Sequence, residues 1–167
     1  MTSPHPNRTR RKDTPPPSTG ASEKEVLTGF LNYLRQSAAG KLRGLDEEAA
    51  RTTHVPSGTT LAGLIQHLAY VERAMFLGET VTSWPQTFRV PPEAKIDDIV
   101  DSYRAVVGQA NDVIDTYDDL SLPAPRLEGR TSGPSMRWAL THMIEETGRH
   151  VGHLDILREL TDGTVGR

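Results

Sequence analysis

The stretch MRWALTHMIEETGRHVGHLDILRE, residues 136–159, decides the fold that we predict for this chain. Its apolar residues, with one threonine and one histidine among them, recur every three or four positions, the spacing that places side chains on one face of an α-helix. This inward face comprises Met136, Leu140, Met143, Thr147, His150, Val151, Leu154 and Leu157. Pro134 suits the first position of a helix, and Asp162-Gly163 suits its end. We therefore expect a long amphipathic helix from Pro134 to about Leu160.

Three more segments combine helical periodicity with a recognisable start. Ser22 is followed three residues later by Glu25, which is the pattern of a capping box. The expected helices begin at Ser22, at Thr59 or Thr60, and at Ile96, and they end near Gly44, Leu77 and Tyr117. No strand pattern competes with them. The sequence therefore predicts an all-α fold, a four-helix bundle.

The segments outside these helices differ in character. Residues 1–21 contain five prolines among polar residues and cannot bury enough apolar surface to offset the entropy lost on ordering. We expect them to be a disordered leader, with the domain spanning residues 22–167. The connection after the second helix is longer than bundle hairpins usually are. It carries Trp84 and Phe88, so we expect it to pack on the bundle and to be able to roof a site.

The composition limits the chemistry available to the chain. There is no cysteine, which excludes disulfides, thiolate metal sites and a cysteine nucleophile. A metal ion would have to be held by His, Asp or Glu, a ligand set that leaves zinc, nickel, iron and manganese open. No apolar run approaches the roughly 20 residues of a membrane helix, and no secretory signal is recognisable. We expect a cytoplasmic protein that does not bind membranes.

The charge is distributed unevenly along the chain. The net charge is −3, but residues 1–21 carry +3, so the remainder carries −6. An acidic domain repels the phosphate backbone of nucleic acids. We therefore expect no nucleic-acid partner for the folded part of this protein.

The last predicted helix carries an acid and a histidine with the spacing of a shared site. Glu146 and His150 are four residues apart and project from one face, whereas Glu145 and His150 are five apart and point in different directions. A carboxylate at the edge of a core is costly unless it is paired or binds a metal. The pair therefore indicates a metal site, and the alternative is a glutamate satisfied by an arginine or lying at the rim of the bundle.

A second histidine lies on the buried side of the second predicted helix. His67 falls beside Leu64, Leu68 and Val71, where a lone histidine is usually a core residue that bonds to a neighbour. Here another helix offers Glu146 and His150 on its own inward face. Three nitrogen and oxygen ligands from two helices leave a coordination position open, which is typical of a catalytic metal site.

The sequence supports a role at this site less strongly for His153 and Glu72. His153 lies one turn beyond His150, too far from Glu146 to share an ion comfortably. We interpret it as a catalytic residue on the substrate side of the site, the alternative being a surface or packing histidine. Glu72 is expected to form an interhelical ion pair with Arg149 or Arg73.

The segments 56–73 and 136–159 together resemble the DinB-like superfamily, and more narrowly its mini-circle branch. The resemblance covers about residues 24–165. It implies a four-helix bundle with up-down-down-up connectivity, often dimeric, and a metal between the second and fourth helices. The mycothiol-dependent maleylpyruvate isomerase branch uses a His, Glu, His ligand set, which corresponds here to His67, Glu146 and His150.

The resemblance also implies what the site does. We expect a divalent-metal-dependent enzyme, a mycothiol-type S-transferase or isomerase, with zinc favoured over nickel, iron or manganese and a small-molecule thiol and an electrophile as substrates. A metal ion can instead activate water for hydrolysis. A non-catalytic metal- or ligand-binding bundle related to stress is a second hypothesis. A bundle whose polar cluster is structural and which acts through protein contacts is a third.

Overall fold

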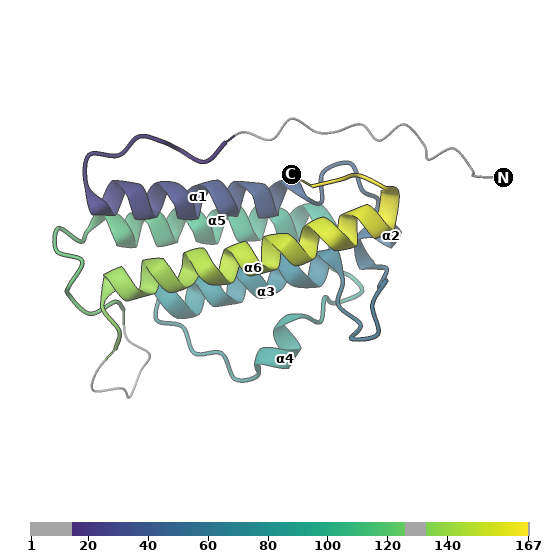
Figure 1. The fold of residues 1–167 in the computed structure, drawn as a ribbon. Coiled ribbons are helices and arrows are strands. Elements are labelled where there is room, and N and C mark those ends of the chain that lie inside the picture. Colours follow the sequence, from purple (N-terminus) through teal and green to yellow (C-terminus); the bar gives the residue numbers. More distant parts are fainter. Residues whose placement is uncertain (1–14, 126–132, 167) are drawn as a thin grey trace.

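Four long helices make up the bundle in the computed structural model, which describes residues 15–125 and 133–166 (Figure 1). They are α1 (Glu23–Gly40), α3 (Leu61–Phe76), α5 (Ile96–Asp115) and α6 (Met136–Asp162). Two short helices, α2 (Glu47–Arg51) and α4 (Trp84–Thr87), lie in the connections. The described residues form no strand, and their single isolated bridge pairs Pro123 with Ser135. The predicted all-α class is confirmed.

The direction of the helices explains the long connection that contains α4. Figure 1 shows α1 and α6 running one way through the bundle, and α3 and α5 running the other way. Because α3 and α5 run in the same direction, residues 77–95 must return along the length of α3 before α5 begins. This return path carries α4 along the outside of α3.

The helix ends follow the predicted capping chemistry with two corrections. Ser22 and Glu25 form the expected capping box, since each side chain accepts a hydrogen bond from the other's backbone N–H. The last helix is capped by Ser135, so Pro134 lies just outside it. The first helix ends at Gly40 and not at Gly44. Beyond its end, the carbonyls of Lys41 and Arg43 accept hydrogen bonds from the Arg158 side chain.

The apolar core is divided into two clusters along the bundle. One cluster includes Leu61, Leu64, Ile65 and Leu154, and the other includes Leu31, Phe76, Leu140 and Met143. Arg35 on α1 and Thr147 on α6 fall where each helix passes from one cluster to the other, and both side chains are buried. The middle of the bundle is therefore polar while both ends are apolar.

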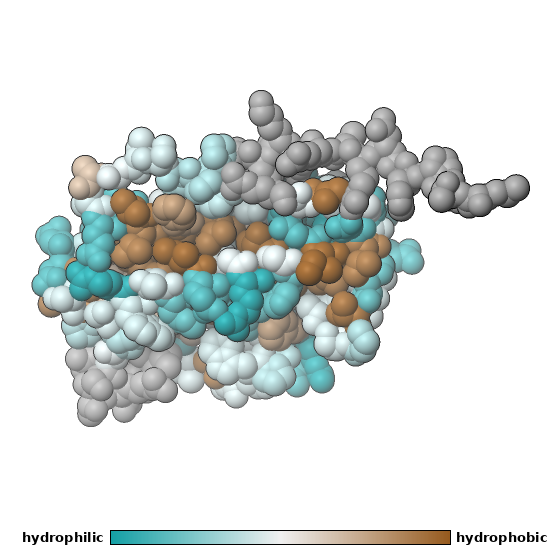
Figure 2. All heavy atoms as spheres, in the orientation of Figure 1, coloured by the Kyte–Doolittle hydropathy of each residue, from teal (hydrophilic) through white to brown (hydrophobic). Residues whose placement is uncertain are grey.

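The packing of the helices is also uneven, because α1 lies closest to α6 and α3 lies closest to α5, with α3 and α6 in contact across the bundle. One face over α1 and α6 exposes apolar side chains (Figure 2). Val26 and Phe30 on α1 and Ile156 and Leu160 on α6 are each at least 38% exposed. None of the helices in residues 15–125 and 133–166 has the length and apolar character needed to cross a membrane.

The predicted leader is described only in part. Residues 1–14 lie outside the described residues, and residues 15–20 have no regular secondary structure. Gly29 on α1 lies close to Pro17, since a Cβ at Gly29 would be 3.2 Å from the Pro17 ring. The disorder of the leader as a whole stays a prediction.

Candidate metal centre

The contact between α3 and α6 brings the three predicted ligands together. His67 projects from α3, and Glu146 and His150 project from α6. One ligand atom of each residue lies within 4.8 Å of those of the other two. Glu146 Oε1 is 3.1 Å from His150 Nε2 and 3.9 Å from His67 Nε2. Metal–ligand bonds of about 2 Å hold ligand atoms about 3–4 Å apart, so the arrangement fits a metal ion with little movement.

Helix geometry explains why Glu146 and not its neighbour faces this site. Glu146 is four residues before His150, so both side chains project from the same side of α6. Glu145 is exposed on another side of the helix, where it pairs with Arg149. The side chain of Glu146 is 19% exposed, which places the ligand group at the border between core and solvent.

Both imidazoles favour the neutral form that binds metal ions. Burial lowers the pKa of His67 to about 4, the nearby His150 acts in the same direction, and Glu146 opposes both. Burial likewise lowers the pKa of His150, again against the effect of Glu146. The three side chains at neutral pH therefore present two neutral nitrogens and one carboxylate.

The α4 connection supplies three contacts to His67 that the sequence analysis did not identify. The hydroxyl of Thr87 lies 2.7 Å from Nδ1 of His67, and the Phe88 ring stacks on the His67 ring with centroids 3.9 Å apart and planes 14° apart. Trp84 approaches the same ring edge-on at 6.0 Å. The connection therefore packs on the bundle as predicted, and it does so against the candidate ligand His67. No periodic signal in residues 77–95 could have singled out Thr87.

The other histidines of α6 lie outside the ligand group. His153 is exposed, and its ring centroid is 5.5 Å from that of His150. His142 stacks on Trp138 with centroids 4.8 Å apart and lies 3.7 Å from Glu145. His153 is thus beside the candidate metal site on its solvent side, whereas His142 is not part of it.

The predicted partners of Glu72 are wrong. Glu72 pairs with Arg35 on α1, and both side chains are almost completely buried. Arg73 pairs with Glu79 instead, and Arg149 pairs with Glu145. The reason is position on the helix, since Glu72 points into the bundle whereas Arg73 is half-buried and Arg149 is exposed at the surface.

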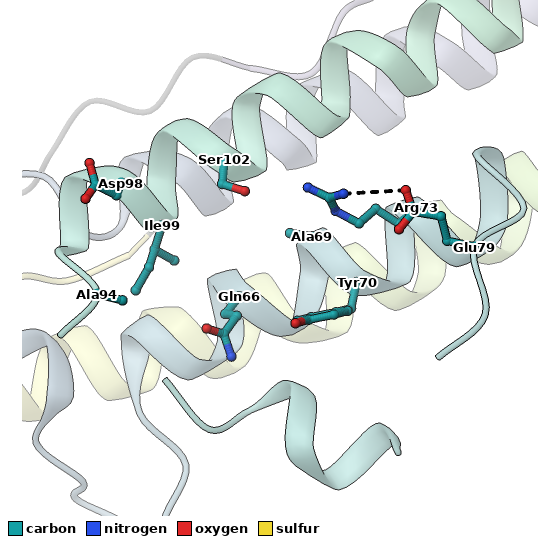
Figure 3. A pocket seen from close by; sticks show the side chains of 9 residues that line it. All are labelled: Gln66, Ala69, Tyr70, Arg73, Glu79, Ala94, Asp98, Ile99 and Ser102. Carbon is teal, nitrogen blue, oxygen red and sulfur yellow. Dashed lines mark hydrogen bonds and ion pairs between the residues drawn. The ribbon is translucent and has the colours of Figure 1, made fainter. Parts of the chain in front are cut away.

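A groove of about 430 Å³ lies on the other side of α3, facing α5 (Figure 3). Gln66, Tyr70 and Arg73 of α3 and Asp98 and Ser102 of α5 line it. None of the three candidate ligands belongs to its lining. Gln66 also bonds to the α4 connection, with its amide nitrogen 2.8 Å from the Thr87 carbonyl and 3.0 Å from the Arg89 carbonyl.

The family model described as mycothiol-S-transferase matches residues 26–163, a range that contains nearly all of α1, the whole of α2–α6 and the three candidate ligands. A search of curated proteins found no match to this chain.

Proposed function

We propose a function in thiol transfer, on the premise that this chain belongs to the mycothiol S-transferase family. The proposed reaction joins the sulfur of a small mycothiol-type thiol to an electrophilic carbon. The S–H bond of the thiol breaks, an S–C bond forms and the bond from that carbon to its leaving group breaks, so that the proton and the leaving group (chloride in the test below) are released. The observation that carries the proposal is the grouping of His67, Glu146 and His150 at the border between core and solvent.

The donor set supports a divalent ion as the cofactor. Two neutral imidazoles and one carboxylate contribute a single negative charge, so a divalent ion held by them would keep a net positive charge. An ion held there would supply that charge to stabilise the thiolate form of the thiol. We propose zinc, with nickel, iron or manganese as alternatives, because imidazole and carboxylate ligands suit all of these metals.

The absence of cysteine supports a nucleophile that comes from the substrate. The chain has no thiol of its own, so no protein sulfur competes with the small thiol for the electrophile. Phe88 and Trp84 beside His67 provide an apolar wall, which limits the access of water to the reacting sulfur. An isomerase reaction would use the same thiolate in a reversible addition.

We propose that His153 is a catalytic residue that accepts the proton of the thiol. Its ring is exposed next to His150 and so can meet a substrate that approaches from solvent. In this role His153 affects the rate without holding the ion. The His153→Gln variant is expected to keep the metal and to lose activity by roughly 10²–10⁴-fold, the range of general acid–base catalysis.

The proposal also covers the oligomeric state and the location of the protein. We propose a homodimer, supported by the exposed apolar side chains over α1 and α6 (Figure 2). We also propose a cytoplasmic location, where small thiols are kept reduced.

The test has two stages. Protein loaded with Zn²⁺ and then dialysed should retain about one ion per chain, as should His142→Ala, a control histidine outside the ligand group. His67→Ala should retain far less. The loaded protein is then mixed with mycothiol and monochlorobimane, and conjugation should exceed the uncatalysed rate. A wild-type protein that retains no ion would overturn the metal site. An ion-loaded protein without conjugation would favour a non-catalytic metal-binding protein.

A further inference from the structure

The hydroxyl of Thr87 lies between an imidazole nitrogen and a backbone carbonyl. Its Oγ1 is 2.7 Å from Nδ1 of His67 and 2.6 Å from the carbonyl oxygen of Trp84. A carbonyl can only accept, and a hydroxyl has one proton to donate. The Thr87 proton therefore goes to Trp84, and the remaining hydrogen bond requires His67 Nδ1 to be the donor.

This arrangement decides which nitrogen of His67 is free for a metal ion. A neutral imidazole carries its hydrogen on only one of its two nitrogens. With the hydrogen on Nδ1, the lone pair is on Nε2, and Nε2 is the atom that lies 3.9 Å from Glu146. His150 differs, because its Nδ1 is buried without a hydrogen-bond partner in the described part of the chain.

The segment that carries Thr87 is held against α3 at several points. Gln66 donates two hydrogen bonds to the carbonyls of Thr87 and Arg89, and Figure 3 shows its amide nitrogen turned away from α5. Gly63 permits the close approach of the connection, since a Cβ there would lie 2.5 Å from the Phe88 carbonyl oxygen. Thr87 itself is only 3% exposed. The hydroxyl therefore has a fixed position relative to the His67 ring.

From these contacts we infer that Thr87 is a positioning residue, which fixes the tautomer and orientation of His67 so that Nε2 faces Glu146 and His150. The inference deepens the proposed function and rests on it for the identity of the ligand. Partners that orient a metal-binding histidine in this way typically change metal affinity 10–100-fold when they are removed. A purely structural threonine would affect folding but would leave the ring tautomer unchanged.

The chain offers a closely matched set of variants. Thr87→Val keeps the shape and removes the hydroxyl, and Thr87→Ser keeps the hydroxyl. Thr116→Val is the control, because Thr116 also donates to the carbonyl three residues earlier, at 2.7 Å, but does so at the exposed end of α5. Should Thr87→Val fail to fold, Thr87→Ala removes the same hydroxyl with less crowding.

Long-range ¹H–¹⁵N correlation spectra of the metal-free protein report the tautomer directly. Wild type, Thr87→Ser and Thr116→Val should show the His67 hydrogen on Nδ1. Thr87→Val should move toward the form with the hydrogen on Nε2, because Glu146 is then the remaining nearby acceptor. An unchanged His67 tautomer in folded Thr87→Val or Thr87→Ala would overturn the inference.

Competition with a chromophoric chelator measures the Zn²⁺ affinity of the same proteins. The affinity of Thr87→Val should fall 10–100-fold, while that of Thr87→Ser should stay within about threefold of wild type. Equal affinity in wild type and Thr87→Val would overturn the inference. A wild-type protein that does not bind Zn²⁺ would instead overturn the proposed function. The spectra of the metal-free protein would still decide the role of Thr87.

Discussion

Arg35 on α1 and Glu72 on α3 form a two-pronged ion pair in the polar middle of the bundle. Nε and Nη2 of the arginine lie 2.7 and 2.5 Å from the two carboxylate oxygens, and neither side chain is more than 1% exposed. Asn32 and Asn111 accept further hydrogen bonds from Nη1 of Arg35. Burial raises the pKa of Glu72, and the opposing charge and hydrogen bonds of Arg35 lower it. The pair therefore depends on both members being present.

We predict that Glu72→Gln lowers the free energy of unfolding by about 3–5 kcal/mol, because it leaves a buried guanidinium without its counter-charge. Urea unfolding followed by circular dichroism measures the change. The double variant Arg35→Met with Glu72→Leu should recover much of the loss, since it removes both charges.

The control is Glu79→Gln, which removes a pair near the surface between Glu79 and the half-buried Arg73, at 3.4 Å. Its effect should not exceed about 1 kcal/mol. Equal changes in the free energy of unfolding for Glu72→Gln and Glu79→Gln would show that the buried pair contributes no more to stability than the pair near the surface.

We predict that Gly63→Ala destabilises the protein and weakens Zn²⁺ binding. The added Cβ would lie 2.5 Å from the Phe88 carbonyl oxygen, so the α4 connection would have to move away from α3 and from His67. Gly108→Ala on α5 is the control, because a Cβ there has no described atom within 4 Å. It should stabilise the helix by roughly 0.5–1 kcal/mol. Thermal unfolding and chelator competition test both variants, and opposite signs of the two stability changes are required.

We predict that metal removal lowers the melting temperature of the wild-type protein. A ligand that binds only the folded state stabilises it, by about 5–10 °C here when the free ion is roughly a hundredfold above its dissociation constant. The chelator effect should disappear in His150→Ala and persist in His153→Ala, because His153 lies outside the ligand group. A shift that persists in His150→Ala would exclude His150 as a ligand.

We predict that Asp162→Asn destabilises the protein at neutral pH but not at pH 2. Burial raises the pKa of Asp162, but hydrogen bonds from Arg158 and Thr164 outweigh it and bring the pKa to about 2. Because this value lies below that of an unfolded aspartate, near 3.9, the carboxylate stabilises the fold above about pH 4. That contribution is lost as the pH falls from about 4 to 2.

The size of this effect is limited by solvent. The Asp162 side chain is 34% exposed, so we expect a contribution of about 1 kcal/mol after screening. Urea unfolding of wild type and Asp162→Asn across this pH range measures it. Asp101→Asn, which removes an exposed pair with Arg104, serves as the control. A difference between wild type and Asp162→Asn that stays constant down to pH 2 would contradict the assignment.

Helical periodicity explains what could be predicted of the site. His67, Glu146 and His150 lie on the apolar faces of two long helices, and a four-residue spacing on a helix fixes which side chains meet. Thr87 and Phe88 lie in an irregular connection, and no repeat in the sequence determines the path of such a segment. The short helices α2 and α4 were missed for the same reason, because four or five residues are too few to show a period.

Charge patterning was a poorer guide than periodicity. Glu72 was expected to pair with a charge close to it in sequence or near the proposed site, but its partner lies 37 residues earlier on α1. Arg35 lies between Leu31 and Ala38 on the buried side of α1. The apolar neighbours of a single arginine do not reveal whether it is buried or turned to solvent, because a long side chain can do either.

The ion pair between Arg35 and Glu72 has a consequence for the alignment of the helices. Apolar side chains are interchangeable enough that a helix can slide along its neighbour and still bury them. A slip of α1 by one turn, about 5.4 Å, would leave a guanidinium and a carboxylate facing hydrocarbon with no opposite charge. We expect the pair to select a single alignment of the helices along the bundle axis. That alignment also fixes the position along the axis at which His67 of α3 meets Glu146 of α6.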